Sequence, residues 1–317
     1  MLKITTRSIV DELKSRGVPV EILEERYGLV RYRVGDQWRL LRSSITDEAS
    51  WLGGFIARDK RITHALLEDE DLRQPATVSF ENEALALGFM NHHEQIVVKP
   101  TDGGHGNGVT VGVRTESALH RAIVVAKQAS RGGEVILQEQ VSGNDIRVLI
   151  IGGSFAAGAL RIPAEVTGDG EHTIRQLIDL ENNDNVKRGN NYSKRLNFID
   201  HEAAERFLGE RIDNGVPAQG EVVRVAGPAN IGAGGTSVNV TDKIPAGIIK
   251  KAERVAELLK LPTCGVDFMV SDAEDAASYR FIEVNACPSF GLHLFPAVGE
   301  PEPVAEAFVN HLLQEAK

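Results

Sequence analysis

The sequence is poor in cysteine and has no long apolar run. Among its 317 residues only Cys264 and Cys287 are cysteines, which make no disulfide framework and fit a reducing compartment. No stretch approaches the roughly 20 apolar residues of a membrane span, and the first residues lack the apolar core of a signal peptide. With 35 basic and 45 acidic residues the net charge is -10, which opposes sequence-independent binding of nucleic acid. We therefore expect a cytoplasmic protein that binds neither membranes nor nucleic acid.

The sequence does have the composition of a globular protein, with 42% hydrophobic and 25% charged residues. Residues 8–16 show the helical spacing of apolar side chains, and short apolar runs predict strands over 18–23, 29–34 and 38–41. The first part of the chain is therefore predicted to be a small α/β unit.

The most distinctive stretch is a glycine-rich loop between two predicted strands. Residues 96–100 are apolar up to Lys99, four glycines follow between 103 and 108, and valines alternate from 109 to 113. Glycine reaches positive φ and lets backbone N–H groups approach an anion. A P-loop or a dinucleotide fingerprint leads into a helix, whereas this loop leads into a strand. The pattern predicts either a flap over nucleotide phosphates, with Lys99 adding a charge, or a hairpin without a ligand.

Periodic patterns continue through the rest of the chain. They predict helices over 115–126, 173–180, 245–260 and 304–312, and strands over 135–138, 145–151, 155–161, 265–270 and 279–285. Gly152 and Gly153 lie between two of these strands and are a strong hairpin signal. The polar stretch 165–214 is compatible with a functional lid or with disorder.

Two of the predicted strands carry carboxylates among apolar residues. Asp267 lies in the first, and Glu283 and Asn285 share one face of the second because side chains alternate along a strand. A buried carboxylate requires a compensating cation. Two carboxylates and an amide oxygen suit Mg²⁺ shared with nucleotide phosphates, and the alternative is pairing with arginines such as Arg280.

Four segments of the sequence resemble the corresponding segments of the ATP-grasp ligases. The resemblance rests on residues 98–113, 161–174, 234–242 and 282–286, and it extends over nearly the whole chain from Lys60 onward. These strings resemble in particular the ATP-grasp module of cyanophycin synthetase, whereas residues 17–60 look more like the linker of bifunctional glutathione synthetase. The resemblance implies an α/β (α+β) architecture, the ATP-grasp fold, in which two α+β subdomains grip ATP. We place them at 59–141 and 142–317, behind a truncated N-terminal α/β unit at 1–58.

The resemblance also implies roles for individual residues. ATP would be bound by two lysines, the glycine flap, a hinge that reads adenine and an acidic residue at the ribose, namely Lys60, Lys99, Gly103, Gly104, His105, Gly106, Gly108, Gln138, Glu139, Val141 and Asp145. Mg²⁺, with Mn²⁺ as an alternative ion, would be held by Asp267, Glu283 and Asn285. Arg147 and Arg161 would lie near the transferred phosphate, and Lys194 belongs to the polar loop 181–195, which would exclude water. His105 is either a phosphate or substrate contact or a solvated flap histidine.

Two positions depart from the family pattern. The hinge begins with Gln138 where relatives often have glutamate, and Gly265 stands two residues before Asp267 where relatives have arginine. The second ligase domain of cyanophycin synthetase is absent from the sequence, so we do not expect a self-contained cyanophycin polymerase.

The implied activity is ADP-forming ligation of a carboxylate to an amine through an acyl phosphate. The substrates would be amino acids or short peptides, and the protein would form a homo-oligomer, as relatives commonly do. Two alternatives stay open, an ATP-grasp protein that ends in phosphoryl transfer to another acceptor and an ATP-binding module without catalysis.

Overall fold

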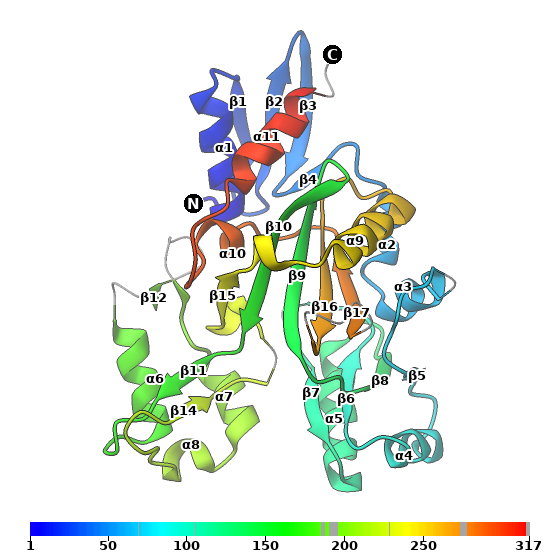
Figure 1. Cartoon of the computed structure of the whole chain (residues 1–317), viewed down its shortest axis with the longest axis vertical. Helices are drawn as coiled ribbons and strands as arrows, with labels where there is room; N and C mark the ends of the chain where they lie inside the picture. The colour runs from blue at the N-terminus through cyan, green and yellow to red at the C-terminus, as the bar shows by residue number, and fades with distance from the viewer. Residues whose placement is uncertain are drawn as a thin grey trace.

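The computed structural model describes residues 1–68, 70–104, 106–184, 188–189, 196–227, 229–272 and 278–314. His105 and Lys194, two of the predicted site residues, lie outside these ranges. Figure 1 shows a central sheet with the N-terminal unit above it, and with a small subdomain and a helical lobe side by side below it.

The central sheet has five strands in the order β15-β10-β9-β16-β17, and all neighbours are antiparallel. The strands are β9 (Asn144–Ile151), β10 (Ser154–Ile162), β15 (Thr236–Asn239), β16 (Cys264–Val270) and β17 (Tyr279–Asn285). Gly152 and Gly153, with φ of 61° and 75°, form the turn between β9 and β10. The predicted hairpin and the predicted carboxylate strands are therefore confirmed.

Each face of the central sheet has its own cover. Helix α9 (Ala246–Leu259) packs on one face, where Val148, Val266 and Phe268 meet Val255 and Leu259. Leu149 and Ile151 point to the other face and belong to a second core. This second core closes only one end of that face, and the opposite end carries the charged side chains described below.

The N-terminal unit completes the second core together with the end of the chain. It consists of α1 (Ile4–Ser15), the antiparallel strands β1 (Val20–Glu24), β2 (Leu29–Val34), β3 (Gln37–Arg42) and β4 (Ile45–Thr46), and α2 (Trp51–Ile56). Ile9, Leu13 and Tyr32 pack with Phe308 and Leu312 of α11 (Val304–Gln314), and α1 and α11 lie side by side in Figure 1. The predicted α/β unit exists, but its core is shared with residues from the far end of the chain. The sequence analysis did not predict α2, whose N-cap is Ser50.

The small subdomain is a second antiparallel sheet with two helices. Its strands are β5 (Thr77–Ser79), β8 (Val135–Glu139), β6 (Ile96–Pro100) and β7 (Thr110–Val113), in this spatial order, and its helices are α4 (Glu83–Asn91) and α5 (Glu116–Ala129). Val98, Leu119 and Leu137 are fully buried in its core. Thr115 caps α5 as predicted, whereas α4 was not predicted. The glycine loop joins β6 to β7, so the predicted order of strand, loop and strand is confirmed.

The polar stretch that follows β10 folds into a lobe with a core of its own. The lobe contains β11 (Glu165–Thr167), α6 (Ile174–Asn183), β12 (Arg188–Gly189), β13 (Leu196–Asn197), α7 (His201–Leu208), α8 (Arg211–Asn214) and β14 (Val222–Arg224). Val166, Ile178 and Val223 are buried in its core. The described part of this stretch is therefore an ordered lobe, and only α6 among its helices was predicted.

Short elements complete the chain. They are α3 (Lys60–Leu66), the 3₁₀ helices η1 (Ile231–Ala233) and η2 (Thr241–Lys243), and α10 (Gly291–Leu294). Within the described residues, every helix falls short of the length and apolar character that would let it cross a bilayer.

Candidate functional site

The charged side chains gather on one face of the central sheet. In the strand register Arg147 lies opposite Asp267, and Asp267 lies opposite Glu283 on the next strand. Arg161 lies opposite Asp145. Residues that face each other in register point to the same side of a sheet. Five predicted site residues are thus neighbours, although they come from four strands.

Two arginines hold the buried carboxylate of Asp267. Arg147 forms a bidentate ion pair with it, with Nε to Oδ1 and Nη2 to Oδ2 both at 2.6 Å. Arg161 Nη2 lies 2.9 Å from Oδ2 of Asp267 and also donates to Asp145 Oδ1 at 2.6 Å. Asp267 is completely buried, so its negative charge depends on these guanidinium groups.

Gly265 makes room for one of these arginines. A Cβ atom at Gly265 would lie 3.2 Å from both Cδ and Nε of Arg147, which is closer than side chains usually approach. The space beside Gly265 on β16 is therefore filled by Arg147 from the neighbouring strand β9. The sequence alone did not show this, because it requires the pairing of β9 with β16.

Glu283 and Asn285 extend the cluster along β17. Lys60 Nζ lies 3.5 Å from Glu283 Oε2, and Asn285 Nδ2 donates to Asp267 at 3.3 Å and to Glu283 at 3.4 Å. Burial favours the neutral form of Glu283, but Lys60, Lys99 and the two arginines outweigh it and lower its pKa to about 2. Glu283 is therefore ionised at neutral pH.

Helix α3 brings Lys60 to this carboxylate. Asp59 caps the helix by accepting from the backbone N–H groups of Arg61 and Ile62. One turn further along, His64 Nε2 bonds to the carbonyl of Ile282 at 3.0 Å, next to Glu283. Burial, with help from Lys99, lowers the pKa of His64 to about 4, so the ring is neutral. His64 thus fastens α3 to β17, a role that the sequence analysis missed.

The glycine loop starts beside Lys60, whose ammonium donates to the carbonyl of Gly103 at 3.3 Å. Gly103, Gly106 and Gly108 have φ of 106°, 70° and 73°. At Gly108 a Cβ would lie 2.4 Å from the Cβ of Ala129, so only glycine fits. Around Gly103 and Gly104 no atom of the described residues, apart from the chain neighbours, lies within 4 Å of such a Cβ.

The hinge residues differ in what their side chains contact. Gln138 is buried and its amide oxygen accepts a hydrogen bond from Lys99 at 2.7 Å. The carboxylate of Glu139 accepts from the backbone N–H of Ala76 at 3.2 Å. Val141 follows the end of β8, in the connection to β9. Both polar hinge side chains are therefore bonded within the small subdomain, and so are the backbone N–H groups of Glu139 and Gln140.

The donor set fits a hard cation. Glu283 is ionised, and Asn285 lies between Glu283 and Asp267. A carboxylate offers about four acceptor positions, and the arginines use three of those on Asp267. One lone pair of Asp267 is therefore left for a cation. The amide of Asn285 now directs Nδ2 at both carboxylates, and rotation of this amide would present its oxygen instead. Asp145 is predicted to contact the ribose. It accepts two hydrogen bonds from Arg161, and both end on Oδ1 rather than on Oδ2.

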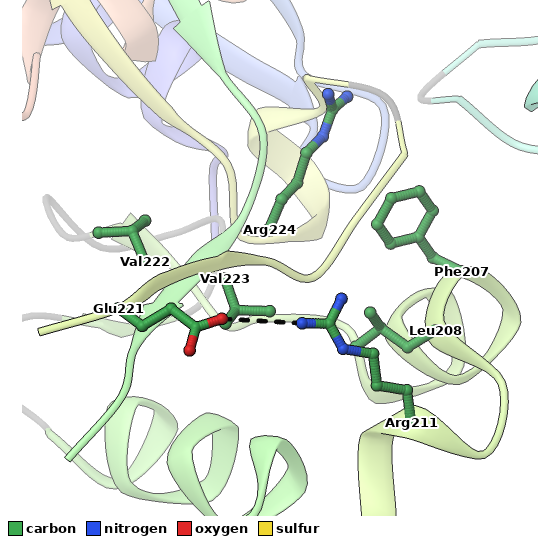
Figure 2. A pocket seen from close by; sticks show the side chains of 7 residues that line it. All are labelled: Phe207, Leu208, Arg211, Glu221, Val222, Val223 and Arg224. Atoms are coloured by element: carbon green, nitrogen blue, oxygen red, sulfur yellow. Dashed lines mark ion pairs between the residues drawn. The ribbon is translucent and has the colours of Figure 1, made fainter. Parts of the chain in front are cut away.

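A groove of about 350 Å³ lies in the lobe, between β14 and the helices α7 and α8. Figure 2 shows Glu221 and Arg211 directed toward each other across it, at 3.8 Å. Arg224 also lines the groove, and it donates through Nε to the carbonyl of Ala226 at 2.8 Å. Of the predicted site residues that the structure describes, none lines this groove.

Two antiparallel α+β subdomains, with a glycine loop on one and a cluster of lysines and carboxylates between them, define a nucleotide-binding fold of the grasp type. The chain belongs to the ATP-grasp family, whose domain model, described as "ATP-grasp domain", matches residues 57–289. The family resemblance inferred from the sequence is thus confirmed.

Curated relatives of this chain are longer than it is. It is 32% identical to a cyanophycin synthetase of Trichormus variabilis over 97% of its own length and 35% of that protein. It is 28% identical to the glutathione biosynthesis bifunctional protein GshAB of Listeria monocytogenes over 99% of its length and 42% of that protein. The chain therefore spans less than half of these relatives.

Solved structures show the same fold. A bifunctional glutathione synthetase from Pasteurella multocida matches with a TM-score of 0.68 and 24% identity, over 99% of this chain and 44% of that one. A D-alanine–D-alanine ligase from Bacillus anthracis matches with a TM-score of 0.51 and 15% identity, over 84% of this chain and 70% of that one. At these identities the matches show the fold alone, and they confirm the predicted ATP-grasp fold.

Proposed function

We propose that this protein is an ADP-forming ligase that joins the carboxylate of an amino acid or short peptide to the amine of an amino acid. The relatives named as cyanophycin synthetase, glutathione synthetase and D-alanine–D-alanine ligase all carry names of ligases. One observation in this chain carries the proposal. Lys60 lies 3.5 Å from the carboxylate of Glu283, and Arg147 and Arg161 both bond to Asp267, which lies opposite Glu283 in the strand register, so cations and carboxylates share one face of the sheet.

This arrangement suits a polyphosphate that approaches the central sheet. Lys60 and Lys99 would contact the phosphates of ATP, and the backbone N–H groups of the glycine loop would close over them. Phosphoryl transfer depends mainly on positioning and on cations that stabilise charge on the transferred oxygens. Glu283, Asn285 and Asp267 would hold Mg²⁺, which neutralises phosphate charge when it is bound.

The arginines would act on the reacting groups. The substrate carboxylate attacks the γ-phosphate of ATP, and an acyl phosphate and ADP form. The amine then attacks the acyl carbon, inorganic phosphate leaves and the amide bond is complete. Arg147 and Arg161 are held by Asp267 and Asp145, so their guanidinium groups are already oriented before substrate arrives.

Water must be kept from the acyl phosphate, because hydrolysis would waste the activated carboxylate. The glycine loop and the lobe are the parts of the chain that would cover the site. The lobe lies close to the flap hairpin, since a Cβ at Gly227 would be 3.2 Å from Val111 of β7. We propose that Lys194, in the loop 181–195, takes part in this cover.

Release of ADP with Mg²⁺ and ATP in the presence of pooled amino acids and short peptides tests the proposal, with mass spectrometry of the products. A product heavier than one substrate by the residue mass of the other is expected. A phosphorylated product without condensation would favour a phosphoryl-transfer enzyme. ATP binding without turnover on any pool would favour a binding module.

A further inference from the structure

A line of three hydrogen bonds inside the small subdomain begins at Lys99. Lys99 Nζ donates to Gln138 Oε1 at 2.7 Å, and Gln138 Nε2 donates to Thr77 Oγ1 at 2.8 Å. Thr77 Oγ1 donates in turn to the carbonyl of Pro75 at 2.9 Å. Lys99 is 5% exposed and Gln138 is 3% exposed, so solvent has little access to the line.

The direction of these bonds is fixed by chemistry. A backbone carbonyl only accepts, so the hydroxyl of Thr77 must donate to Pro75 and is left to accept from Gln138. Gln138 must then direct its NH₂ group at Thr77 and its oxygen at Lys99. An ammonium group only donates, so this oxygen matches it. The network therefore determines which way the amide of Gln138 points.

The acceptor of the Lys99 ammonium is neutral, which has an electrostatic consequence. Among the residues that the structure describes, no carboxylate oxygen lies within ion-pair distance of Lys99, whereas Lys60 lies 3.5 Å from Glu283. Burial and the charge of Lys60 lower the pKa of Lys99 to about 8, against an opposing effect of Glu283. A glutamate at position 138 would instead place a full negative charge on the ammonium.

We propose that Gln138 is a positioning residue whose neutral amide, locked by Thr77, orients the Lys99 ammonium toward nucleotide phosphates without neutralising it. This inference rests on the proposed function, in which Lys99 contacts ATP. In this proposal the side chain of Gln138 acts on Lys99 and does not contact adenine, which the backbone of the hinge would bind.

Binding of ATP and of adenosine to the full chain with Gln138→Glu tests this role, with calorimetry at constant Mg²⁺. The substitution keeps the shape of the side chain, and rotation of the Thr77 hydroxyl satisfies the new oxygen. We expect ATP affinity to fall by about tenfold or more, because the ion pair competes with the phosphates. Adenosine has no phosphates, so its affinity is expected to stay within about twofold of wild type.

A matched control is Gln95→Glu, which adds the same charge to the same subdomain beside Arg114, to which Gln95 now bonds at 3.0 Å. It is expected to change neither affinity. Unchanged ATP affinity in Gln138→Glu would overturn the inference, and so would an equal loss for adenosine and ATP. If Gln138→Glu does not fold, Thr77→Val tests the same role of Gln138. Thr77→Val is expected to weaken ATP binding severalfold and to leave adenosine binding unchanged, and any other result would overturn the inference.

Lys99→Met separates this inference from the proposed function. Loss of ATP affinity in Lys99→Met without any loss in Gln138→Glu would contradict only the role of Gln138. Unchanged ATP affinity in Lys99→Met would contradict the phosphate contact itself, and the inference with it.

Discussion

The central sheet and the small subdomain hold their cations in different ways. On the central sheet Arg147 and Arg161 both bond to the fully buried carboxylate of Asp267, and Arg161 also bonds to the partly exposed Asp145. In the small subdomain Lys99 is equally buried but bonds to a neutral amide. An ion pair fixes the position of both partners, whereas a neutral acceptor positions a cation and leaves its charge available. Arg147 and Arg161 therefore have positions fixed by ion pairs, whereas the charge of Lys99 is left for a ligand to neutralise.

The strongest test on the central sheet is Glu283→Gln. It removes the carboxylate that Lys60 contacts and that would hold Mg²⁺, while the shape of the side chain stays the same. We expect the rate of ADP release to fall by about two to three orders of magnitude while the variant still folds. ADP release at the wild-type rate would remove Glu283 from the site. Glu94→Gln, far from the cluster and 3.8 Å from Arg114, is a control.

Arg147→Ala should affect stability as well as activity. It takes away the bidentate partner of Asp267 and leaves only Arg161 to compensate a fully buried carboxylate. Removal of one partner of a buried ion pair costs about 3 kcal/mol, and urea unfolding measures this. Lys99→Met should cost less, because no buried carboxylate loses its partner. Equal destabilisation by Arg147→Ala and Lys99→Met would contradict the difference between an ion-paired arginine and a lysine with a neutral acceptor.

Gly265→Ala should have an intermediate effect. The new methyl group would press on Cδ and Nε of Arg147 and shift the guanidinium away from Asp267. We expect about 1–2 kcal/mol of destabilisation and a loss of activity without a change in ATP affinity. The control is Gly54→Ala, where no described atom outside the adjoining helix α2 lies within 4 Å of the added Cβ. Wild-type activity of Gly265→Ala would show that Arg147 tolerates displacement.

The smallest expected effect concerns pH. The pKa of Lys99 is lowered to about 8 by burial and by Lys60, so the free ammonium is charged below this pH and neutral above it. ATP affinity should therefore weaken by up to about tenfold between pH 7 and pH 9, where an ordinary lysine stays charged. The arginines of the central sheet keep their charge over this range. A flat profile in wild type, measured by calorimetry, would contradict the buried state of Lys99.

Much of this site could be predicted from the sequence, and the physical reason differs between its parts. Alternation along one strand places Glu283 and Asn285 on one face, and glycine chemistry indicates the flap between β6 and β7. The ion pair of Arg147 with Asp267 could not be predicted, because it depends on which strands are neighbours. The contact of Gln138 with Lys99 had one weak signal, a polar residue in the apolar strand Val-Ile-Leu-Gln.

The helices that the sequence analysis missed have a similar explanation. Helices α2 and α8 have only 6 and 4 residues, which is too short for a helical period to show. Helices α4 and α7 follow N-caps at Asn82 and Asp200, and these caps were the available signal. The second core could not be predicted because α1 and α11 lie at opposite ends of the sequence and pack together only in the folded protein.

Transfer of oxygen from a carboxylate to phosphate shows whether ATP activates a carboxylate before an amide bond forms. The enzyme is incubated with Mg²⁺, ATP and a pool of amino acids and short peptides whose carboxylates carry ¹⁸O. Formation of an acyl phosphate moves one carboxylate oxygen to the released phosphate, so one ¹⁸O atom is expected in phosphate for each ADP. Release of ADP with unlabelled phosphate would contradict the account.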